Sequence, residues 1–139
     1  MELHRGRLID HVQLVVTDIE RSKRFYAAVL GALGMPLGGE GADYFWVDEL
    51  FVSSKDSKAA AGVLTGRTHF AFQAASREAV VKFYEAGVAT GAVSNGPPGE
   101  RPYHPGYFAA FLLDPDGNNV EAVFHGPADR SVPSVVIKF

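Results

Sequence analysis

The 139-residue sequence contains no cysteine, no long apolar run and no excess of basic residues. Because cysteine is absent, disulfides, thiolate metal sites and cysteine nucleophiles are excluded. No stretch approaches the roughly 18 consecutive apolar residues of a membrane span. The chain has 13 Lys and Arg residues against 16 Asp and Glu residues, which argues against nucleic acid as a partner. We therefore expect no membrane and no nucleic-acid partner, and the polar opening of the chain, without a signal peptide, predicts a cytoplasmic location.

The residues that are present are typical of one compact domain over 1–139. Apolar residues make up 47% of the chain, aromatic residues 12% and charged residues 21%. This composition excludes a disordered chain. The length allows one core, or two small cores packed together.

The most informative feature is an internal repeat. The segment His11-Val-Gln-Leu-Val-Val-Thr-Asp18 aligns with His69-Phe-Ala-Phe-Gln-Ala-Ala-Ser76. The same shift pairs Phe25-Tyr26 with Phe83-Tyr84. A histidine, an apolar alternation, a polar helix start and an aromatic pair thus match in one alignment, which indicates two copies of one module. The first module covers about 8–55, the second about 67–125, and a tail follows over 126–139.

Each copy has the pattern of a strand followed by a helix. Alternating apolar residues predict strands over 9–16 and 68–74. The sequence from Thr17 to Glu20 has the form of a capping box, and Ser76 is the expected N-cap of the second helix. Apolar residues at helical spacing follow each cap, so we expect two amphipathic helices that end near Gly34 and Gly91.

Short strands separated by turn residues complete each copy. They are predicted over 44–47 and 50–53, and over 107–113 and 119–125, the last pair joined by the turn residues 114–118. Residues 56–66 read as a linker and His4 as part of a frayed terminus. The segment 95–106 holds several prolines and glycines, which predicts an irregular loop with a functional role or disorder. The expected fold class is α+β, with two tandem βαβββ modules.

The C-terminal segment 132–139 is apolar and rich in β-branched residues. It is expected to add a strand to an exposed sheet edge of its own chain or of a partner chain. This segment, together with the fold, predicts a homodimer.

Three residues stand out as candidate metal ligands. His11 and His69 occupy the same position in the two copies, so a pseudo-twofold axis would place them symmetrically. Glu121 lies between apolar neighbours in a predicted interior strand, where an unpaired carboxylate is costly to bury. Two imidazoles and one carboxylate bind Zn, Ni, Mn or Fe(II) and leave positions open for substrate or water. His125 shares the strand face of Glu121 and is an alternative ligand, while structural roles in the sheets remain an alternative for each residue.

The ends of the repeat resemble a known family. The segment 9–18, followed by Arg21-Ser-Lys-Arg-Phe-Tyr26 and Leu30-Gly31, resembles the opening of the vicinal oxygen chelate superfamily, and 107–121 resembles its closing hairpin. That superfamily contains glyoxalase I, extradiol dioxygenases, fosfomycin-resistance enzymes and bleomycin-resistance proteins. The resemblance implies that His11, His69 and Glu121 hold a divalent metal. It also implies an open, cup-like mixed sheet, formed within one chain or between two.

Many relatives carry a fourth ligand on the last strand of the first module, and in glyoxalase I this group also moves the proton. Here Phe51 aligns with Glu121, so the fourth ligand is absent in this alignment. A two-residue slip keeps the same strand face and would bring Glu49 into the position instead.

The resemblance implies a metal-dependent, glyoxalase-like enzyme with lyase, isomerase or dioxygenase chemistry on a small molecule that chelates the metal through adjacent oxygens. The alternative is a non-catalytic protein of the same fold that binds a small molecule or an antibiotic, like bleomycin-resistance proteins. Trp46 and Phe51 are candidates for an apolar pocket wall. Further candidate pocket residues come from the long loop and its end: Arg101, Tyr103, His104 and Tyr107.

Overall fold

The computed structural model describes residues 2–6, 9–129 and 135–138. The first module contains β2 (Val12–Val16), α1 (Ile19–Ala32), β3 (Gly39–Glu40), β4 (Tyr44–Val47) and β5 (Leu50–Ser54). The second contains β6 (His69–Gln73), α2 (Arg77–Ala89), β7 (Val93–Glu100), β8 (Phe108–Leu113) and β9 (Asn119–Phe124). Two further strands, β1 (Glu2–Arg5) and β10 (Val135–Lys138), lie near the ends of the chain.

The two modules have the same sheet topology. Their strand orders are β2-β5-β4-β3 and β6-β9-β8-β7. In each sheet the first strand of the module runs parallel to the last one, and the other neighbours are antiparallel. The predicted α+β class and the duplicated βαβββ architecture are therefore confirmed. The predicted linker, 56–66, contains neither helix nor strand.

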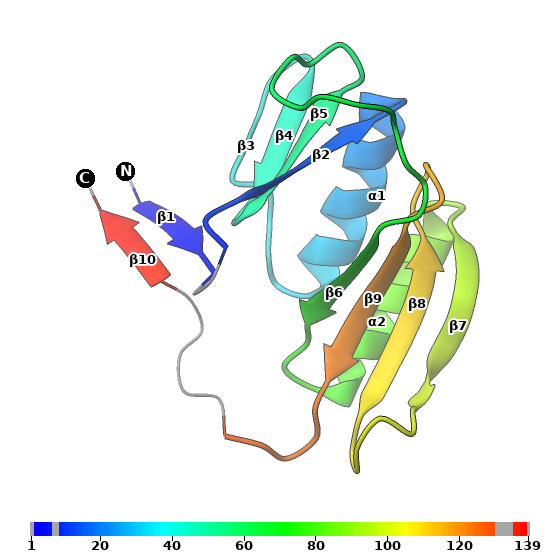
Figure 1. Cartoon of the computed structure of the whole chain (residues 1–139). Coiled ribbons are helices and arrows are strands. Elements are labelled where there is room, and N and C mark those ends of the chain that lie inside the picture. The colour runs from blue at the N-terminus through cyan, green and yellow to red at the C-terminus, as the bar shows by residue number, and fades with distance from the viewer. Residues whose placement is uncertain (1, 7–8, 130–134, 139) are drawn as a thin grey trace.

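Both helices lie on the same side of the two sheets, behind them in the view of Figure 1, and they pack against each other. One hydrophobic cluster extends through both modules, and its members include Phe25, Phe45, Phe83 and Leu112. Because strand side chains alternate between faces, the residues between these core positions point to the face that the helices leave open. No helix in the described part of the chain has the length and apolar character needed to cross a membrane.

Polar contacts also join the two modules. The phenol of the buried Tyr26, in α1, donates to Asp114 Oδ2 at 2.7 Å, where β8 turns toward β9. The backbone nitrogen of Thr17, at the end of β2, donates to Asp116 Oδ1 at 3.2 Å in the same turn. These bonds join the end of β2 and the first helix to the far end of the second sheet.

The helix caps correct one prediction. Ser76 caps α2 as expected, accepting from the nitrogen of Ala79 at 3.1 Å. The N-cap of α1 is Asp18, which accepts from the nitrogen of Arg21 at 3.1 Å, so the predicted capping box of Thr17 and Glu20 is wrong by one residue. A carboxylate caps at least as well as a threonine hydroxyl, and Thr17 bonds the second module instead.

The prediction of an irregular loop over 95–106 is only partly right, because Val93–Glu100 forms strand β7. Among the described strands it pairs only with β8, and its register shifts twice, between Ser94 and Gly96 and between Gly96 and Gly99. An edge strand with bulges tolerates prolines, because a residue without an N–H can lie at a bulge or on the unpaired edge. The expectation of a loop holds only for the part after β7.

His4 lies in strand β1 and not in a frayed end, which is a third correction. Strand β1 pairs antiparallel with β10, as a ribbon apart from the two larger sheets (Figure 1). The predicted C-terminal strand is thus confirmed over Val135–Lys138, and its partner is the N-terminal strand of the same chain. The remaining positions of the predicted segment, 132–134 and 139, lie outside the described residues.

Candidate metal centre in two halves

The second sheet brings His69 and Glu121 together. His69 begins β6 and Glu121 lies in the middle of its parallel neighbour β9, where Ala71 is its register partner. Val120 and Ala122 point into the core, so Glu121 points to the opposite, helix-free face. His69 Nε2 lies 3.1 Å from Glu121 Oε2.

The hydrogen bonds of His69 determine the tautomer of its neutral imidazole. Nδ1 lies 2.9 Å from the carbonyl oxygen of Asn119, which can only accept, so Nδ1 carries a hydrogen. In the neutral imidazole, Nε2 then presents a lone pair to an oxygen of Glu121 that also presents one. Two acceptors at this distance repel unless a cation, either a proton or a metal ion, lies between them.

Glu121 is held in place by a second group. Only 3% of the residue is exposed. The phenol of Tyr107 donates a short hydrogen bond to its Oε1. Burial raises the pKa of Tyr107 above its usual value, the bond to Glu121 raises it further, and the positive charge of Arg101 opposes the rise. Tyr107 therefore remains a donor to the carboxylate throughout the neutral pH range.

The other candidates of the second module surround Tyr107. Its ring lies edge-on to Tyr103, His104 and His125, at centroid distances of 5.0, 5.2 and 5.4 Å. His104 Nε2 and His125 Nδ1 are 2.9 Å apart, and His104 Nδ1 is 2.9 Å from the carbonyl oxygen of Pro105. His125 thus bonds to His104, while His69 is the histidine beside Glu121.

Two more side chains extend the row across the sheet. Phe111, on β8, is the register partner of Glu121, and its ring centroid is 6.2 Å from that of His69. The guanidinium carbon of Arg101 lies 5.3 Å from the centroid of Phe111. Phe111 is not among the candidates predicted from the sequence. Its position in the repeat could have done so, because Trp46 holds the corresponding place beside Phe51 in the first sheet.

The first sheet carries the other half of the candidate set. His11, immediately before β2, has a side chain that is 62% exposed, and its Nδ1 lies 2.7 Å from Asp10 Oδ1. Together with Trp46, Asp48 and Phe51 it lines a cavity of about 270 Å³.

The strand register tests the alignment of Phe51 directly. Gln13 pairs with Phe51 in the first sheet as Ala71 pairs with Glu121 in the second. Phe51 is therefore the structural counterpart of Glu121, as the first alignment predicts, and the first module places a phenyl ring where the second has a carboxylate. Glu49 lies two residues before Phe51, in the turn between β4 and β5. Its carbonyl oxygen accepts from the nitrogen of Val12 at 2.8 Å.

His11 does not join His69 and Glu121 within the chain. It lies at the start of β2, whereas the end of β2, at Thr17, contacts the turn before β9. At about 3.3 Å per residue, the six residue steps from His11 to Thr17 span about 20 Å. Among the residues that the structure describes, no group of three or more His, Cys, Asp and Glu side chains is close enough to share a metal ion.

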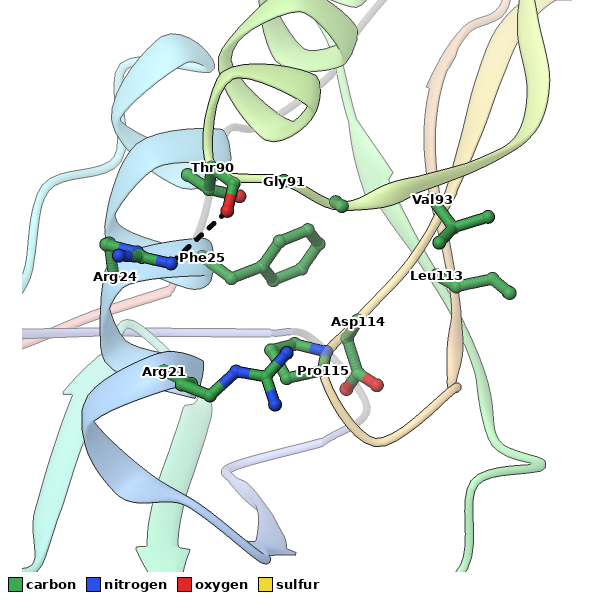
Figure 2. A pocket seen from close by; sticks show the side chains of 10 residues that line it. Arg21, Arg24, Phe25, Thr90, Gly91, Val93, Leu113, Asp114 and Pro115 are labelled. Carbon is green, nitrogen blue, oxygen red and sulfur yellow. Dashed lines mark hydrogen bonds between the residues drawn. The ribbon is translucent and has the colours of Figure 1, made fainter.

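Two other cavities lie away from these half-sites. One of about 340 Å³ opens between β2, the linker and the start of β6, and includes Gln13 and Phe70. The other, about 150 Å³, lies between the first turns of α1, the end of α2 and the β8–β9 turn (Figure 2). There Arg24 Nη2 donates to the carbonyl oxygen of Thr90 at 3.3 Å, so one of its two arginines already bonds the end of α2.

Residues 8–122 match the sequence pattern of the Glyoxalase/Bleomycin resistance protein/Dioxygenase superfamily. The chain is 31% identical to a glyoxalase/bleomycin resistance protein from Albidiferax ferrireducens T118, with a TM-score of 0.65, and the match covers 84% of this chain and 97% of that one. A family enzyme from Burkholderia phytofirmans PsJN is 21% identical, with a TM-score of 0.61 and coverage of 82% and 95%. A lactoylglutathione lyase from Agrobacterium tumefaciens is 19% identical, with a TM-score of 0.61 and coverage of 83% and 91%. No curated protein matches the chain.

Proposed function

The chain belongs to the Glyoxalase/Bleomycin resistance protein/Dioxygenase superfamily, and from this premise we propose that it is a metal-dependent enzyme whose metal site is shared between two copies of the chain. His69 and Glu121 of one copy and His11 of the other are the proposed ligands. The substrate is a small molecule that offers two adjacent oxygens to the metal.

The facing acceptors of His69 and Glu121 carry this proposal. A carboxylate that is 3% exposed, 3.1 Å from an imidazole lone pair, is a donor set suited to a divalent cation. Both donors are oriented by outer partners, His69 by the Asn119 carbonyl and Glu121 by Tyr107. Such partners fix the direction of ligand lone pairs and raise metal affinity.

The second copy is proposed because, among the described residues of the same chain, His11 lies near neither His69 nor Glu121. His11 is exposed beside a cavity on the open face of the first sheet, and the pair in the second module also faces away from the helices. A twofold axis that sets the first sheet of one copy beside the second sheet of the other joins a half-site from each, twice per dimer. This arrangement also provides the homodimer expected from sequence.

A divalent metal at such a site supplies Lewis-acid stabilisation of negative charge on substrate oxygens. The chain's own residues bind and orient around it. Phe51 and Trp46 provide an apolar wall that excludes water, and Phe51 leaves no carboxylate at the position that would serve as a fourth ligand and proton-moving base. Two histidines and one carboxylate with open positions are typical of Fe(II) oxygenases. The ligand set therefore favours oxygenase chemistry over proton transfer of the glyoxalase I kind.

A second candidate function is binding without turnover. The aromatic lining of the first-module cavity, Trp46 and Phe51, favours it because such surfaces hold planar apolar ligands. In that case an aromatic ligand binds with equal affinity with and without metal.

The test is metal binding by untagged protein purified without chelator. We expect about one divalent metal per chain, measured by equilibrium dialysis and elemental analysis with Zn, Ni, Mn and anaerobic Fe(II) in turn. His69→Ala and Glu121→Gln should lower the affinity at least about tenfold, since each removes a ligand. His104→Ala is the matched control, because it removes a nearby histidine outside the pair. Wild-type affinity in His69→Ala and Glu121→Gln would refute the metal site.

A further inference from the structure

The cluster of glycines in β7 surrounds one side chain, the guanidinium of Arg101. A Cβ built on Gly96 would lie 3.2 Å from Arg101 Nη2, and one on Gly99 would lie 3.0 Å from Nη1. Gly96 also has a φ of +148°, which favours glycine. Both glycines occur where the register with β8 shifts. The bulged, glycine-containing edge strand thus leaves the space that this side chain occupies.

The guanidinium is fixed by backbone and by an aromatic ring. Nη2 donates to the carbonyl oxygen of Pro97 at 2.7 Å and Nη1 to that of Glu100 at 3.3 Å. The guanidinium carbon lies over Phe111, 5.3 Å from the ring centroid. Side-chain entropy is therefore already lost in the absence of a ligand, which favours binding by a preorganised group.

Among the residues that the structure describes, no carboxylate forms an ion pair with Arg101, and the neighbouring Glu100 pairs with Arg77 at 2.7 Å instead. An arginine carries five donors, so a guanidinium that bonds two carbonyls retains donors for an anion. Its planar fork matches the two oxygens of a carboxylate or a phosphate group.

The position of Arg101 connects it to the proposed metal site. His69, Phe111 and Arg101 follow one another across the open face of the second sheet, with Phe111 between the imidazole and the guanidinium. A ligand that lies on Phe111 can reach the donor pair with one end and the guanidinium with the other.

We propose that Arg101 is the specificity-determining residue of this site, and that it selects substrates carrying an oxyanion at the end opposite the metal-chelating oxygens. The proposal rests on the proposed function, because the metal holds the other end. The substrate class is thus a planar molecule with two adjacent oxygens at one end and a carboxylate or a similar oxyanion across an aromatic or unsaturated frame.

The test compares two probes of the same shape, 3,4-dihydroxybenzoate and 3,4-dihydroxybenzamide, on the zinc-loaded full-length protein by isothermal titration calorimetry. Both offer adjacent oxygens, and only the benzoate offers a negative charge at the far end. We expect wild-type protein to prefer the benzoate by about tenfold or more, as for a charge-assisted bidentate contact. Arg101→Gln should remove this preference and leave the affinity for the benzamide unchanged.

Two further variants separate recognition from structure. Gly99→Ala keeps the charge and displaces the guanidinium, so the preference should fall to an intermediate value. Arg24→Gln is the matched control, because Arg24 also donates to a backbone carbonyl oxygen, that of Thr90 at 3.3 Å, but lies in α1, away from the open sheet face. It should retain the full preference.

The outcomes distinguish the two proposals. A preference that persists in Arg101→Gln, or an equal loss of both probes in that variant, overturns the role of Arg101. Zinc-dependent binding of both probes with equal affinity by wild-type protein overturns it as well, and leaves the metal site standing. Binding of the benzamide that is the same with and without zinc overturns the metal site and this assignment together.

Discussion

Tyr26→Phe isolates one hydrogen bond that joins the two modules. Tyr26 is fully buried, and its hydroxyl donates to Asp114 Oδ2 at 2.7 Å. The carboxylate also accepts from the side chain of Asn118 at 2.9 Å and from the backbone nitrogens of Asp116 and Asn118 at 2.9 and 2.8 Å. Phenylalanine keeps the ring, and so keeps its packing on Phe25 at a centroid distance of 5.0 Å. The substitution therefore removes one of the four hydrogen-bond donors to the Asp114 carboxylate and leaves the packing of the ring unchanged.

The expected cost follows from the charge on Asp114. A hydrogen bond to an ionised group contributes about 1.5–3 kcal/mol, so we expect the free energy of unfolding to fall by about 2 kcal/mol. A 139-residue chain has an unfolding entropy of about 0.3 kcal/mol per kelvin, which converts this loss to a decrease in Tm of about 7 °C. Urea and thermal unfolding at one fixed protein concentration, followed by circular dichroism, measure both quantities.

Tyr84→Phe is the matched control. Tyr84 is the counterpart of Tyr26 in the repeat and lies at the same place in α2, partly buried against the core. No hydrogen bond joins its hydroxyl to another described residue, so we expect a change within about 0.5 kcal/mol. Equal destabilisation by the two substitutions would refute the role of the Asp114 bond.

Two more predictions concern pH and helix packing. Burial raises the pKa of Tyr26 well above its usual value, and the negative charge of Asp114 and the hydrogen bond to it raise this pKa further. The folded state therefore keeps a proton that the unfolded state loses above about pH 10. Stability should therefore fall as pH rises past 10, and urea titrations in that range should show a shallower fall for Tyr26→Phe; equal slopes would contradict the assignment. Gly87→Ala places a Cβ 2.2 Å from Leu112 Cδ1 and 3.0 Å from Val29 Cγ1, whereas Gly31→Ala meets nothing within 4 Å. We expect a loss of up to about 2 kcal/mol for the first and a gain of about 0.5–1 kcal/mol for the second; the opposite order in urea unfolding would show that α2 does not pack tightly there.

The repeat made much of the fold and half of the site predictable. Alternation and helical spacing are local, so the strands, both helices and the correspondence of Phe51 with Glu121 could be predicted from the order of residues. Neighbouring parallel strands then place His69 beside Glu121, because both strands present one face of the same sheet.

The arrangement of the modules could not be predicted in this way. It depends on bonds between residues far apart in sequence, such as those of Tyr26 and Thr17 with the β8–β9 turn. The pseudo-twofold symmetry of the sequence suggests that His11 and His69 meet, but it does not determine whether they meet within a chain. The wrong prediction for 95–106 has a similar cause, because prolines and glycines taken by themselves indicate an irregular loop. Their role depends on an unpaired sheet edge and on the space that Arg101 requires.

Mixed dimers test the shared metal site most directly. His11→Ala and Glu121→Gln each remove one ligand, so each variant alone should bind zinc weakly. In a dimer of one copy of each, one site combines both defects and the other has all three native ligands. Random mixing by co-refolding should thus restore tight zinc binding to about one quarter of the wild-type sites. Zinc binding that stays as weak in the mixture as in either variant alone would contradict a site built from two chains.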